Sequence, residues 1–375
     1  MKNTNLGLSL LGLSAVLAPS ARADRTYGNI IRPYQTARES AMGGVRYTTG
    51  LYDENFFANP ARMIDSPKWR VDIVNLNVEL NNSAVSNVSK FTSSGDEIEK
   101  LSETAGTNNH VRLQTVIPAY YSHAFANGKY AAAVGLVMST QGDIGLRRSM
   151  ALEPNVFTDV GPAVSLARRF LKGDRLAVGI TGHYTYRLAT RNSFSTINYI
   201  KGEKFDKDTA MGEGSRIDFD LGARQDLAWH PGKWSFQAAA AINNVLGTHY
   251  SANSPDLVAG AQPAPTEQPR TYNAGLSATR EHMLGFTKGT LAFEVQDIGN
   301  NSGGSLFRTL HLGGELAVKD WVYLRAGINQ GYLACGVGFD LPVLKLDLST
   351  YGEEMSLNAG GMEDRRYALR LGLAL

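Results

Sequence analysis

From residue 68 to residue 375, apolar positions alternate with small or polar ones in segments of about 9–16 residues, which is the pattern of β-strands. The last segment is the clearest, because every second residue from Tyr367 to Leu375 is apolar. Segment 214–229 also has one apolar face, from Ile217 to Trp229. Its other face is charged. The chain is therefore predicted to be all-β.

The connections between these segments alternate between tight turns and longer polar loops. Tight turns occur at Ala126-Asn127-Gly128, Lys172-Gly173-Asp174, His230-Pro231-Gly232, Lys319-Asp320 and Leu341-Pro342. Short turns at one end and long loops at the other are typical of a bacterial outer-membrane barrel, in which lipid-facing and lumen-facing residues alternate. We therefore predict a transmembrane antiparallel β-barrel of about 14 strands within residues 68–375. An even number places both mature termini in the periplasm, on the side of the tight turns.

The longest predicted connections are Asn81–His110, Thr190–Gly214 and Gly247–Pro269, and fourteen strands are predicted. They are 68–80, 111–125, 129–139, 157–170, 174–188, 214–229, 233–246, 270–281, 287–298, 306–318, 321–329, 333–341, 343–351 and 365–375.

Two segments precede the barrel. Residues 1–23 are typical of a secretory signal peptide, with Lys2 before a short apolar stretch and the small-x-small sequence Ala21-Arg22-Ala23 at its end. Residues 24–67 do not alternate, and helical pieces are expected near Gln35–Met42 and Tyr52–Phe57. This segment is predicted to fold back into the lumen as a plug, which we call the hatch, or to form a cap beneath the barrel.

Composition narrows the class of protein further. The chain has 37 Lys and Arg against 35 Asp and Glu, and two of the basic residues, Lys2 and Arg22, lie in the predicted signal peptide. A mature chain with balanced charge is not expected to bind nucleic acid. The mean hydropathy of −0.21 is compatible with a membrane barrel, because lumen-facing positions dilute the apolar ones.

No catalytic or metal-binding pattern stands out. The seven histidines are scattered, without an His-x-x-x-His or Cys/His spacing, and neither a Gly-x-Ser-x-Gly motif nor a phosphate-binding loop is present. We therefore expect no enzyme activity, no metal site and no cofactor.

Charged residues of both signs fall on the predicted lumen face. The candidates are Arg187, Arg216, Asp218, Asp220, Arg224, Glu315, Arg325 and Arg370. They predict either a polar conduit, in which an arginine holds a ligand carboxylate, or an ion-pair network that braces the hatch. The interleaved signs favour the network, because buried charges need partners.

The hatch carries a short motif. Gly43-Gly44 is followed by Asn59-Pro60-Ala61, shortly before the first strand. Taken alone, Asn59-Pro60 predicts a helix stop, since proline disfavours a helical conformation in the residue before it. Together with the strand count, the motif resembles the N-terminal hatch of the FadL-like outer-membrane proteins. That superfamily includes transporters of fatty acids and aromatic hydrocarbons, and the PorV-like and TraF-like barrels. Arg325-Ala326-Gly327 and Asp364-Arg365-Arg366-Tyr367 look closer to the last two groups.

The resemblance implies a function. In the transporters, hydrophobic ligands enter from outside, bind in the lumen and leave through a gap in the wall, so we expect passive uptake of hydrophobic small molecules. The alternative is a closed barrel that anchors or docks exported proteins or an envelope secretion machine; an aqueous porin ranks third, because a hatch would obstruct it. Expected partners are outer-membrane lipid, lipopolysaccharide and the barrel assembly machinery, whose C-terminal signal the last strand resembles with Leu375 in place of the usual aromatic residue.

Overall fold

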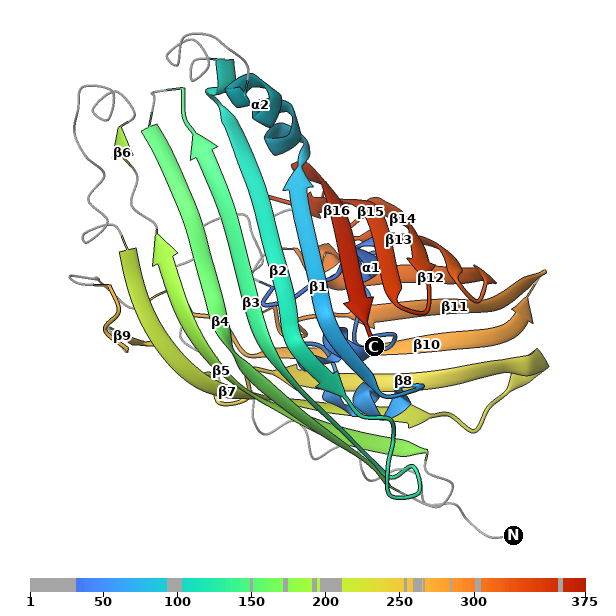
Figure 1. Cartoon of the computed structure of the whole chain (residues 1–375). Coiled ribbons are helices and arrows are strands. Elements are labelled where there is room, and N and C mark those ends of the chain that lie inside the picture. Colours follow the sequence, from blue (N-terminus) through green and yellow to red (C-terminus); the bar gives the residue numbers. More distant parts are fainter. Residues whose placement is uncertain are drawn as a thin grey trace, which may run out of the picture.

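The computed structural model describes residues 32–92, 103–148, 151–170, 175–190, 194–195, 211–252, 255–258, 265, 267–283, 285–300, 305–356 and 360–375. The predicted signal peptide lies outside these residues. Among them, fourteen long strands form one antiparallel sheet that closes between its first and last strands (Figure 1). The prediction of a 14-strand transmembrane β-barrel is confirmed.

The long strands run in chain order around the barrel. They are β1 (Arg70–Asn81), β2 (Thr107–Tyr121), β3 (Tyr130–Leu146), β4 (Ala151–Phe170), β5 (Leu176–Thr190), β7 (Met211–Asp226), β8 (Trp234–Asn243), β10 (Thr271–Met283), β11 (Phe286–Val295), β12 (Leu310–Lys319), β13 (Val322–Asn329), β14 (Tyr332–Asp340), β15 (Leu344–Glu354) and β16 (Glu363–Ala374). The remaining described elements are helices and two short strands that pair with β4 and β7. They are α1 (Ala37–Ala41), η2 (Tyr52–Phe56), η3 (Pro60–Asp65), α2 (Asn82–Thr92), η4 (Pro231–Lys233), η5 (Leu306–Thr309), β6 (Phe194–Ser195) and β9 (Ser251–Ala252).

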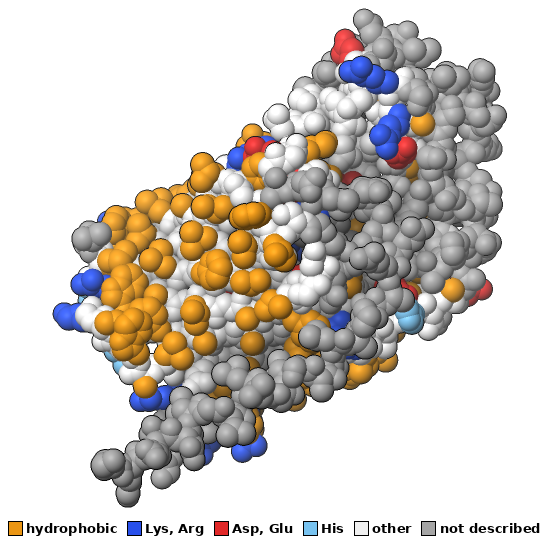
Figure 2. All heavy atoms as spheres, turned by 180° about the vertical axis from the view of Figure 1, so that it is seen from behind, with side chains coloured by type: hydrophobic (Ala, Val, Ile, Leu, Met, Phe, Trp, Pro, Cys, Tyr) orange, Lys and Arg blue, Asp and Glu red, His pale blue; other side chains and the backbone are white. Residues whose placement is uncertain are grey.

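The predicted alternation sets the two faces of each strand. On β7, Arg216, Asp218 and Asp220 are buried, whereas Ile217 and Leu221 between them are exposed. Exposed apolar side chains cover the outer surface in a broad band (Figure 2). Since exposed apolar area of this extent is costly in water, the band is the surface that faces lipid.

We call the two ends of the barrel the turn end and the loop end. The turn end carries the connections β2–β3, β4–β5, β7–β8, β10–β11, β12–β13 and β14–β15, and the loop end is opposite to it. Two connections at the loop end are shorter than the sequence predicts. β13 and β14 are joined there by Gln330-Gly331 alone, and β3 and β4 extend to Leu146 and Ala151, so that only four residues separate them. Gly331 has φ +97, a conformation that suits glycine and permits so tight a turn.

Aromatic residues gather at the turn end. All four tryptophans lie there, in or beside its turns: Trp69, Trp229, Trp234 and Trp321. Arg168 lies over the Tyr130 ring at the same end, 5.3 Å from its centroid. An aromatic girdle of this kind marks a boundary between hydrocarbon and water. Among the described helices, none is long and apolar enough to cross a membrane.

Residues 32–67 lie within the ring of strands, where Figure 1 shows them in blue. α1 and η2 fall where the sequence predicts helical pieces, and α1 begins with a capping box formed by Thr36 and Glu39. Asn59 is extended, with φ −125 and ψ 99, as expected for the residue before a proline. Pro60 is the first residue of η3, a position where its missing N–H has no cost, and Asn59 caps that helix.

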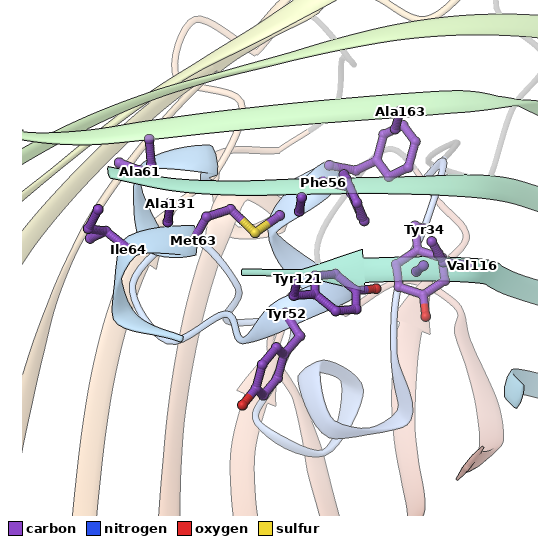
Figure 3. Close-up of a cluster of buried hydrophobic side chains, with 14 of the residues drawn as sticks. Tyr34, Tyr52, Phe56, Ala61, Met63, Ile64, Val116, Tyr121, Ala131 and Ala163 are labelled. Atoms are coloured by element: carbon purple, nitrogen blue, oxygen red, sulfur yellow. The ribbon is translucent and has the colours of Figure 1, made fainter. Parts of the chain in front are cut away.

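The hatch carries much of the apolar core. Tyr34, Tyr52, Phe56 and Met63 pack against inward side chains of β2, β3 and β4, such as Tyr121 (Figure 3). Phe56 and Tyr121 have ring centroids 5.7 Å apart, and Tyr52 meets Tyr121 edge to face at 5.5 Å. The hatch and the barrel wall therefore bury each other's apolar surface.

Candidate functional site

The Asn59-Pro60-Ala61 turn lies against the backbone of the barrel wall. The Asn59 amide donates to the carbonyl oxygens of Tyr47 and of Ala223 on β7, both at 3.1 Å, and its Oδ1 accepts from Ala61 N–H. One side chain thus caps η3, ties two parts of the hatch together and binds the wall.

Two paired glycines make this approach possible. Gly179 on β5 lies opposite Gly222 on β7, and both face the turn. A Cβ at Gly222 would lie 2.0 Å from Asn59 Oδ1, and a Cβ at Gly179 would lie 2.4 Å from Ala61 N. Only glycine leaves room for the hatch backbone at these positions.

The Gly43-Gly44 turn uses a second glycine pair on the other side of the barrel. Gly313 on β12 lies opposite Gly327 on β13, and a Cβ at Gly327 would lie 2.5 Å from Gly43 N. Gly43 and Gly44 have φ +68 and +81, which favours glycine. His311 Nδ1 lies 2.8 Å from the Gly43 carbonyl oxygen, so this nitrogen carries the proton and donates it.

Ion pairs connect the hatch to the wall between these two points. Arg370 on β16 binds Asp53 at 2.6 Å and Glu54 at 3.4 Å. Arg38 of α1 bridges Glu54 and Glu315 of β12, at 2.9 Å each. All but Glu315 are almost fully buried, so each charge depends on its partners.

A second group of contacts involves Glu294 of β11. Its carboxylate accepts the backbone N–H of Arg46 and both the N–H and the hydroxyl of Thr48, at distances from 2.7 to 3.1 Å. A third contact, between Arg224 of β7 and Asp65, lies at the C-terminal end of the hatch. The hatch is therefore held by charged and backbone contacts along its length.

The structure divides the predicted lumen residues into two groups. Arg224, Glu315 and Arg370 contact the hatch, and Arg325 braces Glu315 at 2.6 Å. The other four are Arg187, Arg216, Asp218 and Asp220, which lie on β5 and β7 among contacts to β4 and to the connection after β8.

The hatch side of these contacts was missed by sequence reasoning. Asp53 and Glu54 form an acidic pair within the helical piece predicted at Tyr52–Phe57, but no role was predicted for them or for Arg38. Glu294 follows the inward alternation of β11, but alternation identifies a face and not a partner.

Beside the second group lies a narrow crevice between the hatch and the wall, with room for about one water molecule. Its apolar lining includes Pro33 and Phe57 of the hatch, Val137 of β3 and Val160 of β4. Its polar lining includes Asp159, His183, Arg216 and Gln268. The Phe57 and His183 rings lie 5.5 Å apart.

The wall beside the crevice is irregular. β4 and β5 pair from Val156 to Val160 and again from Ala163 to Phe170, but Gly161 and Pro162 between them pair only with β3. Pro162 has no N–H to contribute to the ladder. Gly161 lines the crevice at this point.

No family model and no curated protein matches the chain. Solved structures do: the Ralstonia pickettii toluene transporter TbuX has a TM-score of 0.51 at 11% identity, over 91% of this chain and 97% of TbuX. A deltaS2 mutant of the Pseudomonas putida monoaromatic hydrocarbon channel TodX has a TM-score of 0.50 at 10% identity, with the same coverage. The chain thus has the fold of the FadL-like outer-membrane barrels, as its hatch motif and strand count predict.

Proposed function

We propose that this protein is an outer-membrane channel for passive uptake of hydrophobic small molecules, with residues 24–67 as its hatch. The crevice beside Gly161 and Pro162 is the observation that carries the proposal. It joins apolar hatch and wall side chains to the one place on β4 where pairing with β5 is interrupted. TbuX and TodX, which have the same fold, are a toluene transporter and a hydrocarbon channel.

The lumen favours a selective route over an open pore. Ion pairs and apolar packing fill the space around the hatch. A filled lumen favours the passage of single ligand molecules past the hatch over the bulk flow of water. The docking alternative is not favoured by the likeness to transporters. Whether the chain belongs nearer the PorV-like or TraF-like branch stays a prediction.

The proposed orientation places the turn end in the periplasm. Longer connections at the loop end, such as that between β8 and β10, support it, because outer loops of such barrels exceed their periplasmic turns. The last residue, Leu375, hydrogen bonds to Val71 at the turn end, so the C-terminus is periplasmic in this orientation.

Uptake into liposomes tests the proposal. Protein reconstituted in liposomes is mixed with labelled toluene or a labelled fatty acid, and entry is followed against empty liposomes, with barrel folding checked by its heat-sensitive gel mobility. Faster entry of at least one compound supports uptake. Entry at the rate of empty liposomes for both, with folded protein, would overturn it.

A further inference from the structure

Two arginines lie on the lipid-facing surface of the barrel wall near the turn end. On β4, Leu166 is 54% exposed, and Arg168, two residues further along the strand, faces the same way. On β10, Leu276 is 53% exposed, and Arg280, four residues further along, also faces outward. The surroundings of both charges are therefore the lipid and the outer wall, and not the hatch.

Each arginine is paired with an aromatic residue at the first position of a neighbouring strand. Tyr130 begins β3 and lies opposite Arg168, whose guanidinium carbon is 5.3 Å from the centre of the Tyr130 ring. Trp234 begins β8 and lies opposite Arg280, whose guanidinium carbon is 6.0 Å from the centre of the Trp234 ring. Both strands start at the turn end, so the same arrangement occurs twice at corresponding levels of the wall.

Neither guanidinium has an acidic partner in the part of the chain that the structure describes. Arg168 lies over a second ring, that of Phe170, at 4.6 Å, and Arg280 Nε has no hydrogen-bond partner among these residues. A guanidinium that stacks on an aromatic ring uses its flat face, and its N–H groups stay free for an acceptor beside the ring. Each site thus offers a positive charge and hydrogen-bond donors to a group outside the protein.

The depth of the two arginines indicates what that group is. An outward arginine is costly at the bilayer midplane and is tolerated near an interface, where its long side chain reaches the headgroups. The aromatic girdle places both arginines at such an interface.

We propose that Arg168 and Arg280 each bind the phosphate group of a phospholipid with a net negative charge, in the leaflet at the turn end. Phosphate oxygens match the fork of N–H donors on a guanidinium. The acyl chains of the same lipid would lie over Leu166 and Leu276, towards the midplane. This inference does not depend on what passes through the barrel.

Retention of lipid by the purified protein tests the inference. The folded full chain in detergent is titrated with phosphatidylglycerol or with phosphatidylcholine of the same acyl chains, and native mass spectrometry counts the lipids bound. Both lipids have a phosphate group, but only phosphatidylglycerol has a net negative charge. We expect phosphatidylglycerol to bind more tightly, with two steps stronger than the rest.

Arg168→Gln and Arg280→Gln each remove one charge and keep a polar side chain. Each should weaken one of the two strong steps about fivefold, the factor that one cation near a membrane surface supplies, and the double variant should weaken both. Arg147→Gln is the control and should change neither step, because Arg147 lies at the loop end and is already paired with Glu153. If Arg168→Gln fails to fold, Arg280→Gln makes the same test.

Three results would overturn the inference. The first is equal retention of the two lipids by wild-type protein, and the second is unchanged binding of phosphatidylglycerol by the folded double variant. The third is a pair of barrels that retains no lipid and dissociates in Arg168→Gln, which would assign this surface to a second copy of the chain. Weaker binding of phosphatidylglycerol in Arg168→Gln and Arg280→Gln, but not in Arg147→Gln, supports the inference.

Discussion

Replacing Arg370 with methionine should loosen the hatch. Arg370 is fully buried and binds Asp53 at 2.6 Å and Glu54 at 3.4 Å, so its loss removes the ion-pair partner of Asp53, whereas Glu54 keeps Arg38 at 2.9 Å. Asp53 still accepts a hydrogen bond from the Tyr34 hydroxyl, at 2.6 Å. Breaking a buried pair on one side costs about 3–5 kcal/mol. The equilibrium between released and docked hatch should shift roughly a hundred- to several-thousand-fold.

Single-channel recording in planar bilayers measures this shift. Wild-type protein should show rare openings, and openings of Arg370→Met should be roughly a hundred- to several-thousand-fold more frequent. Arg147→Met removes a pair with Glu153 whose side chains are 65% and 44% exposed, and it should change nothing, because exposed pairs contribute at most about 1 kcal/mol. Adding Asp53→Asn to Arg370→Met should restore part of the closure. Folded Arg370→Met with wild-type conductance would refute the idea that these contacts hold a gate.

The other predictions concern the fit of the hatch and its response to pH. Gly222→Ala should displace the Asn59 turn and raise cleavage of the hatch in limited proteolysis. Gly145→Ala is the control and should not raise cleavage, because its added Cβ would meet nothing closer than 3.9 Å. Equal cleavage of the two variants would contradict the close approach of the Asn59 turn to Gly222. Burial raises the pKa of Glu39 to about 7 from 4.5, against the opposing effect of Arg46. The Glu39 carboxyl therefore stabilises the fold fully below pH 4.5, and this contribution is lost as the pH rises through 7. The thermal unfolding temperature of the wild-type protein should fall over that pH range, and in Glu39→Gln it should fall less.

The strands could be predicted because their signal is local. Alternation at two-residue spacing fixes both the extended conformation and the inward face, so Arg216, Asp218 and Asp220 were placed on one face from β7 alone. Strand ends were less predictable. β3 and β4 continue past the expected ends, where Asp143 pairs with Asn155, although neither segment shows a strong apolar pattern there.

The hatch contacts could not be predicted, because they join residues far apart in the chain. Arg370 and Asp53 meet only when the barrel closes, and nothing in either local sequence specifies the other. Inward glycines were visible as small residues that leave lumen space. That Gly179 and Gly222 lie opposite each other depends on the register of β5 and β7, which single strands do not reveal.

Filling the crevice tests the central claim most directly. Val137 is an inward residue of β3 that lines it and is 5% exposed, so Val137→Phe places a larger apolar side chain in the proposed path without adding charge. Entry of labelled toluene into liposomes is measured with wild-type and Val137→Phe protein at equal amounts of folded barrel. The account predicts that Val137→Phe lowers entry towards that of empty liposomes. Entry as fast as with wild type would contradict the assignment of the crevice as the route of uptake.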